Sequence, residues 1–372
     1  MNFETYPFEK LNTLLENITP NSDYEPLSLT IGEPQFETPQ FILNALNESA
    51  HLLNKYPKTS GEPILRDAML KYLNTRFGLT LDNSQIIPTF GTREVLFNFP
   101  QFLLHDIENS VMAYPNPFYQ IYEGAAKATN SKVVYLNLTN ENNFQPIVNE
   151  SELKVCDFVI INTPNNPTSS TMLLEELKKW VNLSHLYNFV LLNDECYIDL
   201  YLDEPLPSLL NASIEVGNVD FKNILVINSV SKRSSAPGLR SGFIAGDAEI
   251  LKNYMTYRTY VGCASPLPLQ HAAAVAWADQ AHVDEFRAKY IKNFELAKEI
   301  LGITPPLATF YIWLEVDDEI EFTIRLYRDY NIKVIPGSFL GREGQGEGFV
   351  RLALVYEEEK TREALERVKQ AL

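Results

Sequence analysis

Short apolar runs and helix-like stretches alternate along most of the chain. Six runs are predicted to be strands, at residues 111–113, 133–138, 158–161, 189–192, 224–227 and 242–245. Nearly every position in these runs is apolar, which is typical of strands buried on both faces of a parallel sheet. Helical patterns separate the runs. Together they predict an α/β fold with a large, doubly wound, mostly parallel domain.

The pattern changes after the last of these runs, where an amphipathic helix is predicted. Its apolar face carries Phe286, Tyr290, Phe294 and Ala297. Mixed segments follow at 309–316 and 350–354, and they indicate a smaller α/β domain. A length of 372 residues agrees with two domains, because it is long for a single core.

Net charge, the length of apolar runs, and the spacing of cysteines and histidines limit the partners, metal sites and compartment that we predict. The chain has 48 acidic and 31 basic residues, and its net charge of −17 disfavours nucleic acids and anionic membranes. No apolar run is long enough to span a bilayer. Cys156, Cys196 and Cys263 lack metal-ligand spacing, and the histidines are scattered, so we predict no metal site. Reduced cysteines and an acidic start that does not resemble a signal peptide predict a cytoplasmic protein.

Lys232 follows an apolar run that ends at Val230, in a turn where a strand would deliver it into a cleft. A lysine in a cleft can form an imine with an aldehyde, and pyridoxal phosphate is the cofactor that proteins hold in this way. Ser229 supplies a hydroxyl and Arg240 a planar cation for the cofactor phosphate. Alone, Lys232 and Arg233 would more often be a solvated basic pair, so further anchors are needed.

Polar residues at other strand and helix ends supply these anchors. Asp194 follows a buried run, at the edge where open α/β sheets bind ligands, and its carboxylate would pair with the pyridine nitrogen. Tyr197 and Asn166 would bind the phenolic oxygen. Gly91 and Thr92 precede an apolar helix, where backbone N–H groups can face the phosphate. Each could also be an ordinary turn or cap residue, and only their combination favours a cofactor site.

Taken together, these residues resemble the class I/II aminotransferases of pyridoxal-phosphate fold type I, which have the aspartate-aminotransferase fold. The matching motifs follow one another along nearly the whole chain: Ile31-Gly32-Glu33-Pro34, Gly91-Thr92, Asn166-Pro167-Thr168, Asp194-Glu195-x-Tyr197, Ser229-x-x-Lys232 and Arg351. By this resemblance a large domain spans residues 39–274 and a small domain spans 275–372. Residues 1–38 form an N-terminal arm and part of the small domain.

The resemblance implies a cofactor role for each anchor. Lys232 is expected to bind the cofactor aldehyde and to move the proton that leaves the substrate Cα, while Tyr119 stacks on the ring. Asp194 pairs with the ring nitrogen, and Asn166 and Tyr197 bind the phenolic oxygen. The expected phosphate ligands are Gly91, Thr92, Ser229 and Arg240.

Other matched residues concern the substrate and a second subunit. Arg351 is expected to bind the substrate α-carboxylate through two parallel hydrogen bonds, with Gly32 and Asn166 at the same end. Alone, Arg351 would more often be a strand arginine in a surface ion pair. Tyr56 matches a tyrosine that reaches the phosphate of a neighbouring subunit. The resemblance therefore implies a homodimer whose active sites are shared between subunits.

One residue departs from the family pattern. The family usually carries glycine after the Asn-Pro-Thr motif, whereas this chain has Ser169. Serine adopts a positive φ less readily than glycine does. We expect a slightly different turn in this loop, with the contacts of Asn166 retained.

Within the family, the resemblance narrows to the bacterial N-succinyl-LL-diaminopimelate aminotransferases, for example through residues 91–97 and 117–124. These enzymes move an amino group from glutamate to N-succinyl-2-amino-6-ketopimelate in lysine and diaminopimelate biosynthesis. Such a substrate carries several carboxylates, so a second cation is expected besides Arg351. Arg258 is the favoured candidate. The other candidates are Arg93, Lys58 and Arg233.

Two further functions remain open. The same scaffold can serve another aminotransferase, aspartate-specific or of broad specificity, or a carbon–sulfur lyase, because the protein decides which bond of the substrate breaks. In each case the partners are small amino acids and oxo acids. A non-catalytic regulator that binds the cofactor is the third possibility. The intact Lys232, Asp194 and Arg351 favour turnover, and no basic helix-turn-helix segment is visible at either end.

Overall fold

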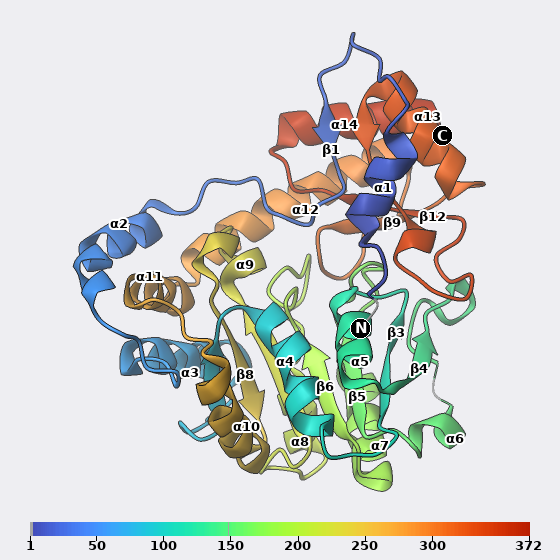
Figure 1. Cartoon of the computed structure of the whole chain (residues 1–372). Coiled ribbons are helices and arrows are strands. Elements are labelled where there is room, and N and C mark those ends of the chain that lie inside the picture. Colours follow the sequence, from blue (N-terminus) through green and yellow to red (C-terminus); the bar gives the residue numbers. More distant parts are fainter. Residues whose placement is uncertain (1–2, 148) are drawn as a thin grey trace.

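The computed structural model describes residues 3–147 and 149–372. Figure 1 shows a large part built around a central sheet and a smaller part that lies above one edge of this sheet. The predicted α/β fold is confirmed, because the central sheet has seven strands and is mostly parallel. No helix within the described residues is both long enough and apolar enough to cross a membrane.

The central sheet has the strand order β2-β8-β7-β6-β5-β3-β4. β8 is antiparallel to both of its neighbours, and the other pairs are parallel. The strands are β2 (Ile86–Thr89), β3 (Val111–Asn116), β4 (Lys132–Asn137), β5 (Phe158–Asn162), β6 (Val190–Asp194), β7 (Ile224–Ser229) and β8 (Gly242–Gly246). The carboxyl ends of the parallel strands meet at one edge, and this edge faces the smaller part (Figure 1).

Strand β2 is not among the six strands that the sequence pattern predicts. Proline has no N–H group to donate, so Pro88 weakens a strand prediction. In the structure β2 lies at the edge of the sheet, where Pro88 pairs with Phe243 of β8. An edge strand tolerates this proline because only one of its sides is paired.

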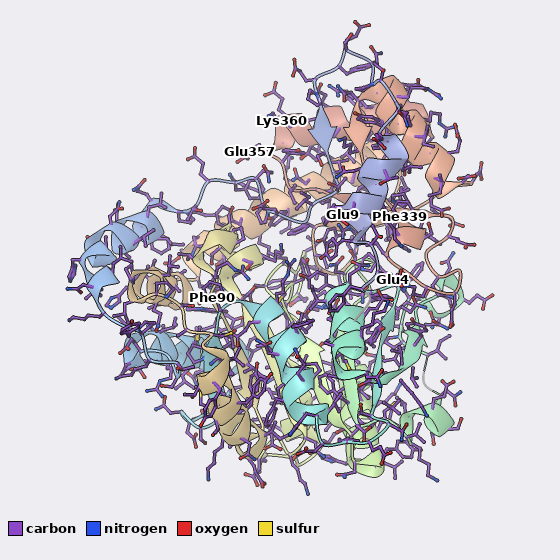
Figure 2. The ribbon with its side chains drawn as sticks, in the orientation of Figure 1. Glu4, Glu9, Phe90, Phe339, Glu357 and Lys360 are labelled. Atoms are coloured by element: carbon purple, nitrogen blue, oxygen red, sulfur yellow. The ribbon has the colours of Figure 1, made fainter. Side chains whose placement is uncertain are left out.

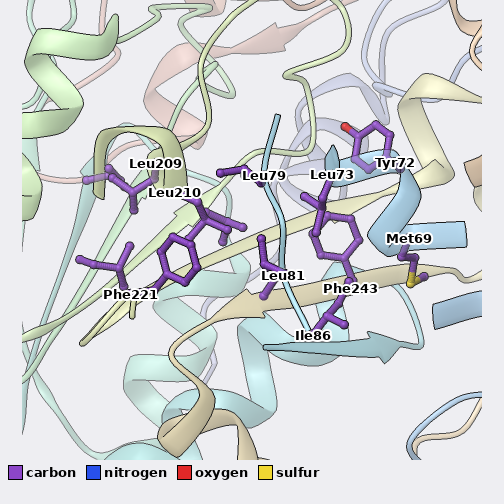
Figure 3. Close-up of a cluster of buried hydrophobic side chains, with 14 of the residues drawn as sticks. Met69, Tyr72, Leu73, Leu79, Leu81, Ile86, Leu209, Leu210, Phe221 and Phe243 are labelled. Carbon is purple, nitrogen blue, oxygen red and sulfur yellow. The ribbon is translucent and has the colours of Figure 1, made fainter. Parts of the chain in front are cut away.

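Helices cover both faces of the sheet, and successive strand residues face opposite layers. Val159 and Leu191 belong to a core shared with α2, α3, α7, α8 and α11, whereas Ile160 and Leu192 belong to a core shared with α4, α5 and α10. This two-sided burial explains why the strands are continuously apolar. Figure 3 shows side chains of the first core, among them Met69, Tyr72, Leu73, Leu209, Leu210 and Phe243.

The helices of the large part have these bounds: α2 (Gln40–Ser49), α3 (Pro63–Phe77), α4 (Thr92–Leu104), α5 (Ile121–Thr129), α6 (Glu150–Leu153), α7 (Leu174–Tyr187), α8 (Leu209–Glu215), α10 (Ala248–Val261) and α11 (Leu267–Ala278). The predicted domain boundary after residue 38 directly precedes α2. The predicted boundary after residue 274 falls inside α11. Both domain boundaries stay predictions.

The smaller part contains an antiparallel sheet in the order β11-β12-β9 and a short parallel pair of β1 with β10. Its strands are β1 (Leu27–Ser28), β9 (Tyr311–Glu315), β10 (Ile332–Lys333), β11 (Ile335–Pro336) and β12 (Phe349–Ala353). Its helices are α1 (Pro7–Leu15), α12 (Ala281–Leu301), α13 (Glu319–Tyr330) and α14 (Glu358–Ala371). The predicted apolar face of α12 is buried, as its four named residues show.

Candidate active site

A cavity of about 830 Å³ lies between the carboxyl edge of the central sheet and the smaller part. Phe90, which Figure 2 labels close to the amino end of α4, is part of its wall. Most of the predicted site residues line this cavity: Gly32, Thr92, Tyr119, Asn166, Asp194, Tyr197, Ser229, Lys232, Arg240 and Arg351. Residues from distant parts of the chain thus meet where open α/β sheets bind ligands.

Lys232 lies in the short helix α9 (Val230–Arg233), which begins directly after β7. Its Nζ donates a hydrogen bond to the carbonyl oxygen of Gly32 in the N-terminal arm. Burial lowers the pKa of Lys232 to about 8. A lysine with this pKa is partly neutral near physiological pH, and the neutral amine is the nucleophilic form.

Asp194 is the last residue of β6 and is only 5% exposed. Its Oδ2 accepts a hydrogen bond of 2.9 Å from the Tyr122 hydroxyl, and its Oδ1 accepts one of 3.3 Å from the Cys196 N–H. Burial raises the pKa of Asp194, and these two donors offset part of the rise. A cation facing this carboxylate would stabilise its charged form.

Arg351, on β12, presents a partly satisfied guanidinium to the cavity. Its Nη1 donates a hydrogen bond of 2.7 Å to Asn166 Oδ1, and its Nη2 donates to the carbonyl oxygen of Thr30. Its Nε is buried and has no partner within the described residues. The guanidinium carbon lies 4.5 Å from the ring centre of Tyr311. This arrangement leaves a buried donor available for an anionic ligand.

Tyr197 contacts the same aromatic residue, since its hydroxyl lies 3.0 Å from the Tyr311 hydroxyl. Burial raises the pKa of Tyr197 well above its usual value, so the phenol stays neutral and can donate a hydrogen bond. Tyr311 is not among the site residues predicted from the sequence.

An anion cradle lies at the amino end of α4. Gly91 has a φ of +75°, and a Cβ at this position would collide with the Arg240 guanidinium. Only glycine lets the arginine pack against the backbone in this way. Thr92 Oγ1 and Ser229 Oγ lie 3.2 and 3.8 Å from Cys196 Sγ, so both hydroxyls gather at one point. With the helix amino end, these groups form a positive, donor-rich pocket.

Tyr119 lies on the cavity wall beside Arg93. Arg93 Nε donates a hydrogen bond of 3.0 Å to the Tyr119 hydroxyl, and this is the only hydrogen bond of the Arg93 side chain within the described residues. The rings of Tyr119 and Tyr122 meet edge-on with centroids 5.9 Å apart. Tyr122 therefore links the predicted stacking residue to Asp194. The sequence gives a signal for Tyr122, because it follows Tyr119 by three residues on an apolar segment.

Three predicted residues are not among those that line the cavity: Gly91, which packs against the Arg240 guanidinium, and Tyr56 and Arg258. Tyr56 is completely exposed. Arg258 is completely buried, and its Nε and Nη2 donate to the Glu94 carboxylate at 2.7 and 3.0 Å, while Nη1 donates to Thr59. Within this chain the Arg258 guanidinium is already paired with Glu94 and does not line the cavity, so its role as the second substrate cation stays a prediction that these contacts do not support.

The remaining cation candidates separate clearly. Arg233 is buried and binds Asp199 through a 2.8 Å ion pair, and exposed Lys58 lies 3.7 Å from Glu62. Of the four candidates, Arg93 is the one that lines the cavity. No cluster of three or more potential metal ligands occurs within the described residues.

Comparison with known proteins places this site in a family. The model of aminotransferase class I and II matches residues 24–368. The chain belongs to the class I and II aminotransferases. A crystal structure of the aminotransferase AspB of Helicobacter pylori is similar, with a TM-score of 0.97 and 48% identity over 100% of this chain and 99% of that chain. An aminotransferase of Neisseria meningitidis has a TM-score of 0.93 and 38% identity over 99% and 97% of the two chains.

Curated relatives of this aminotransferase differ in their substrates. LL-diaminopimelate aminotransferase of Syntrophobacter fumaroxidans is 28% identical over 98% of this chain and 95% of its own length. Aspartate aminotransferase of Pyrococcus horikoshii is 28% identical over 98% of this chain and 94% of its own length. The relatives thus establish amino-group transfer as the reaction class without selecting one substrate.

Class I and II aminotransferases depend on pyridoxal phosphate, and the described residues of this aminotransferase fit the cofactor. Gly91 and Arg240 leave a cradle for its phosphate. The Asp194 carboxylate is buried, and a facing protonated ring nitrogen would stabilise its charged form. Lys232 supplies an amine that is partly neutral.

Proposed function

We propose that this aminotransferase transfers the amino group of glutamate to N-succinyl-2-amino-6-ketopimelate and works in lysine and diaminopimelate biosynthesis. The observation that carries the proposal is the presence of Arg93 on the cavity wall in addition to Arg351. Arg93 takes the place predicted for Arg258. A guanidinium with a single hydrogen bond can bind the distal carboxylate of a succinylated substrate.

The proposed roles of the other residues follow from their contacts. Arg351, whose Nε is unpaired within the described residues, binds the substrate α-carboxylate. When bound, the cofactor draws electrons from the bonds at the substrate Cα. The neutral Nζ of Lys232 takes up the proton that leaves Cα and releases it again. With the cofactor bound, the Asp194 carboxylate would accept a hydrogen bond from its cationic end, and Tyr197 would donate one to its phenolic oxygen.

The proposal includes a homodimer in the cytoplasm. Tyr56 is completely exposed on this chain, as expected of a side chain that completes the phosphate site of a second subunit. All three cysteines are free, which agrees with a reducing compartment. The exposed Tyr56 supports a shared active site, which a hybrid dimer of two inactive variants would test.

A comparison of amino donors and acceptors tests the substrate. The purified protein, supplied with pyridoxal phosphate, is assayed with 2-oxoglutarate and, in turn, with N-succinyl-LL-diaminopimelate, LL-diaminopimelate and aspartate. We expect the highest kcat/KM for the succinylated donor. A higher kcat/KM for aspartate or for free LL-diaminopimelate would contradict the assignment and retain an aminotransferase of another specificity. Release of pyruvate and ammonia from a sulfur-containing donor would indicate a lyase instead.

A further inference from the structure

Ser169 connects the loop of Asn166 to the first residues of β9. Its Oγ lies 2.6 Å from Thr309 Oγ1 and 2.9 Å from the Tyr311 carbonyl oxygen. The Tyr311 N–H donates in turn to Thr309 Oγ1 at 3.0 Å. All three residues are at least 96% buried. These contacts join the large part of the molecule to the smaller part inside the protein rather than at its surface.

The donors and acceptors available on Ser169, Thr309 and Tyr311 fix the direction of each hydrogen bond between them. The Tyr311 carbonyl can only accept, so the Ser169 hydroxyl donates to it. Thr309 Oγ1 accepts from the Tyr311 N–H, and its own proton is then directed to Ser169 Oγ. The three groups form a closed ring in which each hydroxyl both donates and accepts. Buried rings of this kind strengthen their members and are sensitive to the loss of one group.

The backbone is held in an unfavourable conformation to make this ring. Ser169 has a φ of +62° and Thr309 a φ of +83°. A positive φ is uncommon for any residue with a Cβ and is an outlier for a β-branched one. Glycine would fit both positions with less strain, so the hydroxyl groups give these residues a role that glycine lacks.

The hydrogen-bonded ring lies next to the two groups that contact Arg351, the arginine expected to bind the substrate α-carboxylate. Ser169 follows Asn166 by three residues in one loop, which is closed by hydrogen bonds between Asn165 and both Ser169 and Ser170. Asn166 Oδ1 accepts from Arg351, and the Tyr311 ring lies against the same guanidinium. Ser169 therefore fixes the distance between the Asn166 loop and Tyr311, which both contact Arg351.

We propose that Ser169 is a positioning residue that orients Arg351 for the substrate α-carboxylate by anchoring Tyr311 to the Asn166 loop. The inference rests on the proposed role of Arg351. Amino donor and oxo-acid acceptor share the α-carboxylate, so both depend on this orientation.

The test compares the loaded wild-type enzyme with Ser169→Gly and Ser169→Ala. Ser170→Ala is the matched control, since the Ser170 hydroxyl accepts from Thr168 and does not contact β9. We expect KM for glutamate and for 2-oxoglutarate to rise together by roughly 3- to 10-fold in both Ser169 variants, the worth of about one hydrogen bond. kcat should change less, and the control should match the wild type. Unchanged KM values in both Ser169 variants would overturn the inference, whatever happens to their thermal stability.

Hydrogen exchange provides a second readout that needs no substrate. The peptide containing Tyr311 should exchange its amide hydrogens faster in Ser169→Gly than in the wild type and the control, because the ring no longer holds the strand. Ser169→Gly removes the strained Cβ and is therefore the test variant if Ser169→Ala does not fold. If the wild type shows no amino transfer, the proposed function fails. The exchange data still decide the anchoring, which unchanged exchange would overturn.

Discussion

Burial shifts the pKa values of several single residues in the cavity. Lys232 is the clearest case, because burial lowers its pKa from 10.5 to about 8. Burial has the opposite effect on Asp194 and Tyr197, whose pKa values rise. The three groups thus lie in one cavity with a partly neutral amine, a carboxylate that favours a facing cation, and a neutral phenol.

The pKa of Lys232 gives stability a defined dependence on pH. Below about pH 8 the buried charge costs folding free energy, and this cost disappears as the pH rises from 8 towards 10.5, because the unfolded chain then binds more protons. We predict that Lys232→Met raises the free energy of unfolding of the cofactor-free protein at pH 7. The difference from the wild type should shrink between pH 8 and 10.5. Urea denaturation at several pH values measures the free energy of unfolding of both proteins. A difference between them that is independent of pH would argue against a lowered pKa of Lys232.

Arg93 and Arg258 form a contrasting pair. Arg93→Gln should raise KM for N-succinyl-LL-diaminopimelate roughly 10-fold or more, because it removes a charged hydrogen bond, and should affect glutamate much less. Arg258→Ala should instead lower the free energy of unfolding by about 3–5 kcal/mol, because it leaves Glu94 buried without its partner. Steady-state kinetics and urea denaturation of both variants distinguish a role in substrate binding from a role in stability. Equal kinetic losses for both substrates in Arg93→Gln would remove Arg93 from the distal site.

At the scale of elements, the ends of strands and helices carry the site. Strands β6 and β7 deliver Asp194 and Ser229, and the amino end of α4 provides the anion cradle. Such ends can be predicted from sequence, because an apolar run stops at a polar residue or a helix starts after a glycine. For this reason the sequence predicts that Lys232, Asp194 and Thr92 lie in one cavity, and all three line it.

Contacts between elements could not be predicted in the same way. The pairing of Arg258 with Glu94 joins residues 164 positions apart, and no local pattern reveals it. The same holds for Tyr311, which reaches Tyr197 across 114 positions. Strand β2 escapes prediction for a local reason: Pro88 weakens the strand signal, and it is tolerated only because the strand lies at an edge.

The cradle at α4 leads to a prediction about cofactor affinity. Gly91→Ala should raise the Kd for pyridoxal phosphate roughly 10-fold, because a Cβ disfavours the positive φ and displaces Arg240. Gly238→Ala is the matched control, since no heavy atom lies within 4 Å of its added Cβ. Equilibrium dialysis measures both affinities. Equal affinity of the two variants would show that the Gly91 backbone does not shape the phosphate site.

At the scale of the whole molecule, the two parts enclose the cavity and are joined by buried polar contacts. Arg342 of the smaller part binds the Glu123 carboxylate of α5 through two hydrogen bonds of 2.6 and 2.8 Å. Asn116, at the end of β3, exchanges hydrogen bonds with the backbone of Arg342. These contacts join the part that carries Arg351 to the part that carries Lys232, and both side chains line the cavity.

The proposed dimer can be tested by mixing inactive subunits. Lys232→Ala and Tyr56→Ala each impair a shared site, but a hybrid dimer contains one site with both native residues. We predict that unfolding and refolding the two variants together restores about a quarter of the wild-type activity, as random pairing requires. Separately refolded variants serve as the control. Activity no higher than the sum of the separate variants would show that Tyr56 acts within its own subunit or not at all.

Lys232 is proposed to bind pyridoxal phosphate in this cavity and to enable amino transfer from glutamate. The most direct measurement is the visible absorbance spectrum of the loaded protein, recorded before and after glutamate and then after 2-oxoglutarate, for the wild type and for Lys232→Ala. We predict that glutamate abolishes the visible band of the wild type, that 2-oxoglutarate restores it, and that Lys232→Ala shows no such cycle. An unchanged wild-type spectrum, or the same cycle in Lys232→Ala at a comparable rate, would contradict the account.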